Sequence, residues 1–249
     1  MVERASRAPV GTFHAPGAWE RGARVELAAT SAHHALVKRL AVGDVVHLTS
    51  GDGRRASGEI AELSKSRMVV ALGDDPVDEV PIPARVELWA PVGDRDRMLM
   101  LAEKATELGV SSWRPIVYAR SRSVSPRGEG EAFREKLRAR QVSALEQSGG
   151  AWLPDAHAEI SFASAMMDAS NSRLGMRLLL DGDGEPVADV LRGIETPVCI
   201  ALGPEGGLEE SERAEFIRAG WRAVSLGRNV LRFETAAIAA LAIVRSHLR

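Results

Sequence analysis

Apolar and polar positions alternate in short runs along the amino-terminal part of the chain. Such runs favour strands, because successive side chains of a strand face opposite sides. Glycine, serine and aspartate separate the runs, as turns require. The expected strands lie at residues 24–27, 45–49, 56–63 and 67–72. Several short strands at this spacing predict a small β-barrel over residues 1–75, with one helical turn at 33–40.

The spacing changes after an acidic, proline-containing stretch at residues 76–84, which we interpret as a linker. Beyond it, short apolar runs alternate with amphipathic segments. Strands are expected at 86–90, 113–118, 176–180, 198–201 and 223–225. Helices are expected at 94–108, 129–148, 161–169, 186–192, 209–219 and 235–248. This alternation predicts an α/β domain over residues 85–249, whose parallel sheet is covered on both faces.

The last expected helix is apolar on nearly every side between Ala236 and Val244. A helix of this kind must be buried. Burial against a second copy of the chain is as plausible physically as burial within one copy. The pattern therefore predicts a homodimer that uses this helix.

Composition narrows the class of protein. Of the 249 residues, 45% are hydrophobic and 27% are charged, as in soluble globular proteins. The net charge of −2 gives no sign of a nucleic-acid partner, although a local basic face would suffice for one. Since no apolar run approaches the roughly 20 residues that span a bilayer, we expect a cytoplasmic protein without a membrane partner.

The spacing of the residues that can ligate metals does not match a known metal site. Cys199 is the single cysteine, so an internal disulfide and a zinc site of several cysteines are excluded. Within an apolar run, it is expected to be a small buried side chain. The sequence Asp181-x-Asp183-Gly184 lacks the later ligands of a calcium loop, and we interpret it as a turn. No metal is expected.

Two loops carry most of the candidate chemistry. They cover Leu202–Gly207 and Leu226–Ala236, and each follows an expected strand and precedes an expected helix. Such loops at the carboxyl ends of parallel strands are where α/β proteins bind ligands. Their glycines allow close approach of the backbone to a ligand. No G-x-G-x-x-G or Walker-type sequence is present, so an ordinary dinucleotide or nucleotide loop is unsupported.

The motifs of these loops resemble those of a known family. They are Gly203-Pro204-Glu205-Gly206-Gly207, Leu226-Gly227 and Leu231-Arg232-x-Glu234-Thr235-Ala236. Earlier matches are His33, Val37-Lys38-Arg39-Leu40, Gly43-Asp44, the Glu103–Val110 helix end and Glu146-Gln147-Ser148. In this order and spacing, they resemble the ribosomal RNA small subunit methyltransferase E family of the SPOUT superfamily, over nearly the whole chain.

The resemblance implies a fold and a reaction. The fold is a trefoil-knotted α/β methyltransferase domain preceded by a PUA-like barrel, in a homodimer. Periodicity alone would have excluded a knot, because threaded chains are very rare. The reaction is methylation of N3 of a uridine in 16S rRNA by S-adenosyl-L-methionine. Rival hypotheses are a related SPOUT ribose 2′-O-methyltransferase and a non-catalytic RNA-binding assembly factor.

Residue roles follow from the resemblance and from chemistry. Adenine needs an apolar slot, and the sulfonium donor is already an electrophile, so no metal is needed. The expected cofactor contacts are Leu179, Leu180, Leu202, Gly203, Gly206, Gly207, Leu226, Gly227, Val230 and Leu231.

Uridine N3 carries a proton, so it is a poor nucleophile until that proton leaves. Arg232 is the candidate cation that stabilises the resulting anion. Glu234 is the first candidate to accept the proton and Glu205 the second. Structural roles are open alternatives: a helix-dipole contact for Glu205, and a cap or a salt bridge to Arg232 for Glu234.

Expected RNA contacts lie in both parts of the chain: Lys38, Arg39, Lys104, Gln147 and Arg228. Strand ends of the barrel add Arg54, Arg55, Lys65 and Arg67, which form either an RNA-backbone surface or a solvated face. The chain departs from the family at Gly150 (usually Arg), Arg228-Asn229 (usually Pro-Arg) and Phe233 (usually Thr). Phe233 either stacks on a base or packs in the dimer.

Overall fold

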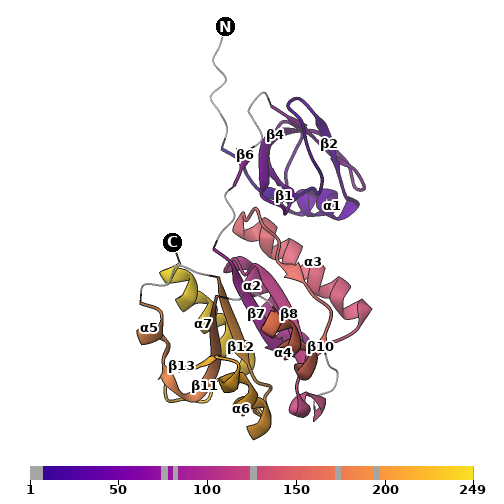
Figure 1. Ribbon diagram of the computed structural model, residues 1–249. Helices are drawn as coiled ribbons and strands as arrows, with labels where there is room; N and C mark the ends of the chain where they lie inside the picture. The colour runs from indigo at the N-terminus through magenta and orange to yellow at the C-terminus, as the bar shows by residue number, and fades with distance from the viewer. Residues whose placement is uncertain are drawn as a thin grey trace. The chain divides into compact units, whose positions relative to one another are not determined.

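The computed structural model describes residues 8–73, 78–80, 84–123, 128–171, 175–192 and 197–248. The chain forms two compact units (Figure 1). The first unit contains Met1–Ile82 and Val142–Leu153, and the second contains Pro83–Gln141 and Pro154–Arg249. Of the predicted linker, residues 76, 77 and 81–83 lie outside the described residues.

A small barrel-like sheet makes up most of the first unit. Its strands are β1 (Thr12–His14), β2 (Arg24–Leu27), β3 (Val45–Thr49), β4 (Arg54–Leu63), β5 (Met68–Leu72) and β6 (Asp78–Glu79). The strand order is β1-β3-β4-β5-β2, and β6 pairs with β4. The predicted barrel is confirmed, but the sequence pattern missed β1 and β6. Strands of two or three residues are too short to show an alternation.

Helix α1 (Ala29–Val37) begins and ends earlier than the predicted turn at 33–40. Its end is set by Arg39, which has a left-handed backbone with φ of 59°. The backbone N–H of Leu40 then donates to the carbonyl oxygen of Ala35 at 3.0 Å, which closes the last turn. Lys38 and Arg39 therefore lie just beyond the helix, where both are exposed.

The end of a later helix packs on this barrel. Glu146 accepts a hydrogen bond of 2.8 Å from the backbone N–H of His14 in β1. Thr49 Oγ1 donates to the carbonyl oxygen of Gly150 at 3.0 Å. The backbone N–H of Gly53 donates to Ala151 at 2.9 Å. These bonds explain why residues 142–153 belong to the first unit.

A sheet of parallel strands forms the second unit. The strands are β7 (Val86–Pro91), β8 (Ser112–Val117), β9 (Asp155–Ala156), β10 (Ile160–Ser161), β11 (Met176–Pro186), β12 (Val198–Leu202) and β13 (Arg222–Ser225). Their order is β10-β8-β7-β12-β11-β13, with β9 beside β8. The helices are η1 (Ala119–Ser123), α2 (Arg95–Glu107), α3 (Glu131–Ser148), α4 (Phe162–Asn171), α5 (Val187–Val190), α6 (Glu210–Arg218) and α7 (Phe233–His247). The predicted α/β architecture is confirmed.

Both faces of this sheet are buried. Along β12, Ile200 contributes to a core shared with α2 and α7, whereas Cys199 and Ala201 contribute to a second core shared with α4 and α6. Successive residues of a strand face opposite sides, which explains why these strands appear as continuous apolar runs. Cys199 is buried as predicted, and burial raises the pKa of its thiol well above the usual value.

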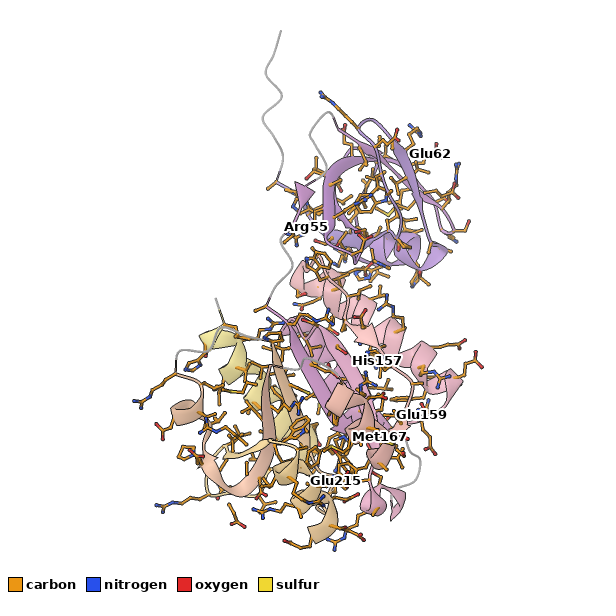
Figure 2. All side chains as sticks on the ribbon, in the orientation of Figure 1. Arg55, Glu62, His157, Glu159, Met167 and Glu215 are labelled. Atoms are coloured by element: carbon orange, nitrogen blue, oxygen red, sulfur yellow. The ribbon has the colours of Figure 1, made fainter. Side chains whose placement is uncertain are left out.

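Helix ends in the second unit follow ordinary capping rules. The Asp94 side chain accepts the backbone N–H of Arg97 at 3.0 Å and so begins α2, as predicted. Arg245 of α7 donates its Nε–H to the carbonyl oxygen of Leu108 at 3.1 Å, beyond the end of α2. Glu159, labelled in Figure 2, accepts from the backbone N–H of Gly130 at 3.1 Å, just before α3.

Strand β11 is longer than predicted. The expected turn at residues 181–184 is wrong, since β11 runs to Pro186. Its register against β13 shifts between Leu180 and Glu185, so the intervening residues form a bulge within the strand. A side chain at Gly184 would collide with the backbone of β13, so only glycine fits there.

Helix α7 buries one face within its own unit, through Phe233, Glu234, Ala237, Ala240, Leu241 and Val244. It packs against α2, β7 and β12. Thr235 and Ala242 are exposed. The prediction that this helix must be buried is thus met in part by one copy of the chain. Over the part of the chain that the structure describes, no helix has the length and hydropathy needed to cross a membrane.

Candidate functional site

A pocket of about 780 Å³ lies in the second unit, where the carboxyl end of β12 meets the bulge of β11 and the loop before α7. Its lining includes apolar, glycine and charged residues. They are Arg97, Leu180, Asp181, Gly182, Asp183, Leu202, Gly203, Pro204, Glu205, Gly207, Leu208, Glu210, Arg213, Val230, Leu231, Arg232, Phe233 and Ala236. The position matches the carboxyl edge at which parallel sheets bind ligands.

The structure brings the two predicted loops together in this pocket. Predicted site residues that line it are Leu180, Leu202, Gly203, Glu205, Gly207, Val230, Leu231 and Arg232. Other predicted residues lie outside its lining. Leu179 is buried in the core shared with α4 and α6. Leu226 packs against the core on the opposite face, and Gly227 is exposed.

The Leu202–Gly207 loop has little conformational freedom. The backbone N–H of Gly207 donates to the carbonyl oxygen of Pro204 at 2.8 Å, and Gly207 has a left-handed φ of 72°. A side chain at Gly203 would approach Leu208 Cγ to 2.9 Å. Glycine is therefore needed at both positions, for backbone conformation at Gly207 and for space at Gly203.

Helix α6 anchors the far side of this loop. Glu209 is the N-cap of α6 and forms a capping box with Glu212, which accepts the Glu209 backbone N–H at 2.9 Å. The other carboxylate oxygen of Glu212 accepts the backbone N–H of Ala119, in η1, at 2.9 Å. Arg120 of η1 donates to the carbonyl oxygen of Gly206 at 2.9 Å. Element η1 thus supports the loop.

Arg97 is a pocket residue that the sequence analysis missed. It lies in the first turn of α2, its Nη1 contacts Glu205 Oε1, and its Nε lies 4.0 Å from Glu234 Oε1. A cation in the first turn of a helix opposes the helix dipole. An arginine three residues after the expected cap Asp94 could therefore have indicated, from the sequence alone, that Arg97 has a role outside the helix.

Glu234 lies beneath the pocket rather than on its wall. It is 4% exposed, and its Oε2 atom has no hydrogen-bond partner in the structure. Its ion pair is with Arg97, not with Arg232. Arg232 is the N-cap of α7, is exposed and lines the pocket, and its side chain makes no capping hydrogen bond.

A second arginine–carboxylate pair also lines the pocket. Arg213 Nε donates to Asp181 Oδ2 at 2.6 Å. Partial burial acts to raise the pKa of Asp181, but the hydrogen bonds from Arg213 and from the Asp183 backbone outweigh it, so the pKa is lowered. Asp181 is therefore ionised at neutral pH. The walls can accept both a cationic and an anionic group of a ligand.

Phe233 is 4% exposed and packs in the core of its own chain. A side chain at Gly93 would approach its ring to 3.1 Å, so Gly93 provides the space that the ring fills. Packing against a second copy is therefore not what buries this ring. Phe233 is also among the residues that line the pocket.

The predicted RNA contacts lie apart from the pocket lining. Lys104 donates to Glu103 at 2.8 Å and to Glu107 at 2.7 Å, so its charge is already compensated. Gln147 and Arg228 are exposed.

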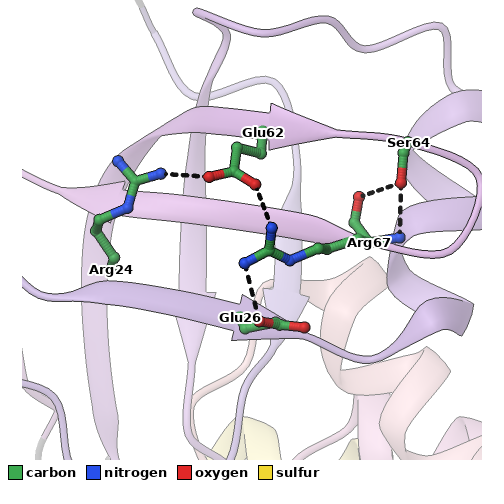
Figure 3. A network of polar contacts seen from close by, with 5 residues as sticks. All are labelled: Arg24, Glu26, Glu62, Ser64 and Arg67. Carbon is green, nitrogen blue, oxygen red and sulfur yellow. Dashed lines mark hydrogen bonds and ion pairs between the residues drawn. The ribbon is translucent and has the colours of Figure 1, made fainter.

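One face of the barrel carries compensated charge. Figure 3 shows that Glu62 lies between Arg24, at 2.8 Å, and Arg67, at 2.6 Å. Arg67 also contacts Glu26 at 3.3 Å. The charge of Arg67 is therefore balanced by two carboxylates on this face. Exposed pairs of this kind add little stability.

Comparison with known proteins decides the family. Residues 80–245 match the family described as an RNA methyltransferase domain, and residues 27–72 match the RNA methyltransferase PUA domain. The chain belongs to the RNA methyltransferase family. This confirms the family resemblance carried by the loop motifs. No cluster of three or more His, Cys, Asp or Glu suited to a metal occurs among the described residues.

Individual relatives agree with this assignment. The chain is 24% identical to ribosomal RNA small subunit methyltransferase E of Synechocystis sp. (strain ATCC 27184 / PCC 6803 / Kazusa), over 85% of this chain and 69% of that protein. It is 26% identical to the Bacillus subtilis (strain 168) protein of the same name, over 85% and 86%.

A solved structure shows the same fold. The ribosomal RNA small subunit methyltransferase E from Neisseria gonorrhoeae, bound to S-adenosyl methionine, superposes with a TM-score of 0.82. The two chains are 26% identical, and the match covers 95% of this chain and 97% of that chain. The match thus includes residues of both units.

Proposed function

We propose that this protein transfers a methyl group from S-adenosyl-L-methionine to N3 of a uridine in 16S rRNA. The observation that carries the proposal is the pocket in which the Leu202–Gly207 loop and the loop before α7 meet. The names of the relatives support a ribosomal RNA substrate of the small subunit, and the cofactor in the Neisseria gonorrhoeae structure supports the same donor.

The residues of the pocket fit the donor. Its volume of about 780 Å³ lies within the range of ordinary ligand pockets. Leu202 and Leu231 offer apolar surface for adenine, and Gly203 and Gly207 leave room beside the backbone. Asp181 and Glu205 place two carboxylates on the lining, and carboxylates attract a cationic donor. When bound, S-adenosyl-L-methionine supplies an electrophilic methyl group.

Arg232 is the proposed catalytic cation. Loss of the N3 proton leaves negative charge on the uracil oxygens, and the exposed guanidinium of Arg232 on the pocket wall stabilises that charge. Glu205 also lines the pocket and is half-exposed, so it is placed to accept the proton. On geometry, Glu205 takes precedence over the buried Glu234 for this role.

Further assignments in this proposal follow the resemblance. Residues 1–75 hold rRNA through Lys38 and Arg39, residues 76–84 connect the domains, and residues 85–249 form the knotted domain that transfers methyl. Lys104, Gln147 and Arg228 assist RNA binding. The protein acts in the cytoplasm as a homodimer, whose second copy covers the exposed side of α7. A monomer in light scattering at micromolar concentration would contradict the dimer.

The experiment that tests the reaction supplies labelled S-adenosyl-L-methionine to 30S subunits and to naked 16S rRNA in parallel. We expect label in one of these substrates, and mass spectrometry of nuclease digests should place the methyl group on uracil N3. Methyl on a ribose 2′-oxygen would favour a 2′-O-methyltransferase. No transfer, together with no heat of cofactor binding in calorimetry, would favour a non-catalytic assembly factor.

A further inference from the structure

We propose that Arg97 is a positioning residue of the methyl-transfer site and that Glu234 acts through Arg97 rather than on the substrate. The proposal rests on the proposed function for its catalytic readout. It deepens that function by explaining why a carboxylate is buried beneath the pocket.

Arg97 connects three segments that are distant in the sequence. Its backbone belongs to the first turn of α2, where the Asp94 cap holds its N–H. Its side chain contacts Glu205 in the Leu202–Gly207 loop and Glu234 in the first turn of α7. The two loops that form the pocket are therefore joined by one guanidinium.

Glu234 is unsuited to direct contact with a base. Its side chain is 5% exposed and is absent from the lining of the pocket, whereas the side chain of Arg97 is 30% exposed and lines it. A buried carboxylate is costly unless a cation or hydrogen-bond donors compensate it. The start of α7 supplies a favourable dipole, and Arg97 supplies the cation.

The geometry gives the pair a specific task. A planar guanidinium can contact two carboxylates through different edges, which an ammonium cannot do with the same fixed orientation. Glu234 Oε1 lies 4.0 Å from Arg97 Nε, and a different nitrogen of the same guanidinium, Nη1, contacts Glu205. These two contacts fix the orientation of Glu205, the carboxylate that is proposed to accept the N3 proton.

A double-mutant cycle tests this dependence. The variants are Arg97→Gln, Glu234→Gln and both together, with Arg192→Gln as the control. Arg192 pairs with Asp189 at 3.0 Å on the surface of the same unit, outside the pocket lining. Methyl transfer is measured as kcat and KM for RNA, and melting temperatures establish that each variant is folded.

We expect each single variant to lower kcat by roughly 10- to 100-fold with little change in KM, as for groups that act in the transition state. The double variant should be no slower than the slower single variant, because the two residues act as one unit. Arg97→Lys should recover only part of the loss. The proposal would be overturned if the kcat losses of the two single variants multiplied in the double variant. It would also be overturned if Glu234→Gln lowered kcat far more than Arg97→Gln does.

A measurement that needs no turnover separates this proposal from the proposed function. In ¹⁵N spectra of the arginine side chains, the Arg97 Nε–H should be protected from solvent exchange, and Glu234→Gln should shift it. An unchanged signal would contradict the positioning role. If the wild-type protein transferred no methyl while this signal responded as expected, the proposed function would fail, and the dependence of Arg97 on Glu234 would stand.

Discussion

Arg120 Nη1 donates a hydrogen bond of 2.9 Å to the carbonyl oxygen of Gly206. The side chain also lies under the loop, since a Cβ atom placed on Gly206 would approach Arg120 Cβ to 3.2 Å. The loop that forms one wall of the pocket is thus held by Arg120 of η1 and by Arg97 of α2. Its shape before ligand binding is set by these contacts.

Arg120→Ala should weaken cofactor binding without unfolding the protein. A hydrogen bond from a charged donor contributes about 1.5–3 kcal/mol, and exposure to solvent reduces this, so we expect a roughly tenfold higher Kd. Calorimetry with S-adenosyl-L-methionine measures it. Arg218→Ala, which removes an exposed arginine from the last turn of α6, serves as the control. An unchanged Kd for Arg120→Ala would show that the loop needs no such support.

Arg232→Ala should retain cofactor affinity and lose turnover. Removing one group that stabilises a developing anion costs about 100- to 1,000-fold in kcat. The Arg232 side chain makes no capping hydrogen bond to α7, so the helix should be unaffected. Steady-state methyl transfer and calorimetry report the two quantities. Arg228→Ala, in the same loop, should instead raise KM for RNA. Full activity of Arg232→Ala would remove Arg232 from the mechanism.

Arg39→Gly should raise the stability of the protein and weaken its binding to RNA. Arg39 has a φ of 59°, a conformation that glycine adopts without the cost that other residues incur. The variant should be more stable by roughly 0.5–1 kcal/mol in urea unfolding. It should also bind RNA more weakly, with a salt dependence reduced by about one phosphate contact. Arg39→Lys keeps both the strain and the charge, so it should change neither. Unaltered RNA affinity in Arg39→Gly would exclude this residue from the RNA surface.

The Glu146→Gln variant should gain stability at neutral pH. Burial raises the pKa of Glu146, against the lowering effects of the His14 N–H, His34 and Lys38. A raised pKa means that the carboxyl group favours folding below its unfolded pKa of about 4.3, and that this contribution is lost as pH rises through the folded value. Glutamine can still accept the His14 N–H without carrying charge.

Urea unfolding of wild-type protein and Glu146→Gln at pH 7 and pH 4 checks this. We expect the stability advantage of the variant at pH 7 to shrink at pH 4, where the wild-type carboxyl group is largely protonated. An equal stability advantage at both pH values would show that packing, rather than ionisation of Glu146, causes the difference in the free energy of unfolding.

Long apolar runs and helix caps allowed most of the second unit to be predicted. Buried parallel strands such as Val198–Leu202 are apolar on both faces, so they appear in the sequence as continuous apolar runs. The Asp94 cap marks the start of α2. The β11 bulge was missed because its acidic residues are typical of a turn, although pairing with β13 resumes at Glu185. The contacts of residues 142–153 with the barrel depend on tertiary structure, so their place in the first unit cannot be predicted from the order of elements alone.

Only the parts of the candidate site that lie in the two loop motifs could be predicted from the sequence. The glycines and charges of the two loops were enough to predict that Gly203, Glu205 and Arg232 share one pocket. Arg97 could not be found in this way, because it comes from a helix start more than a hundred residues earlier in the chain. Burial of Glu234 was equally hidden, because its position in the first turn of α7 is compatible with either a cap or a ligand contact.

The central claim is that one pocket holds the methyl donor beside Arg232, and a crystal structure of the protein with S-adenosyl-L-methionine tests it most directly. The account predicts adenine against Leu202 and Leu231, and the methyl-bearing sulfur on the side of the pocket that carries Arg232. Donor bound elsewhere on the protein, or crystals grown at saturating donor with none in this pocket, would contradict it.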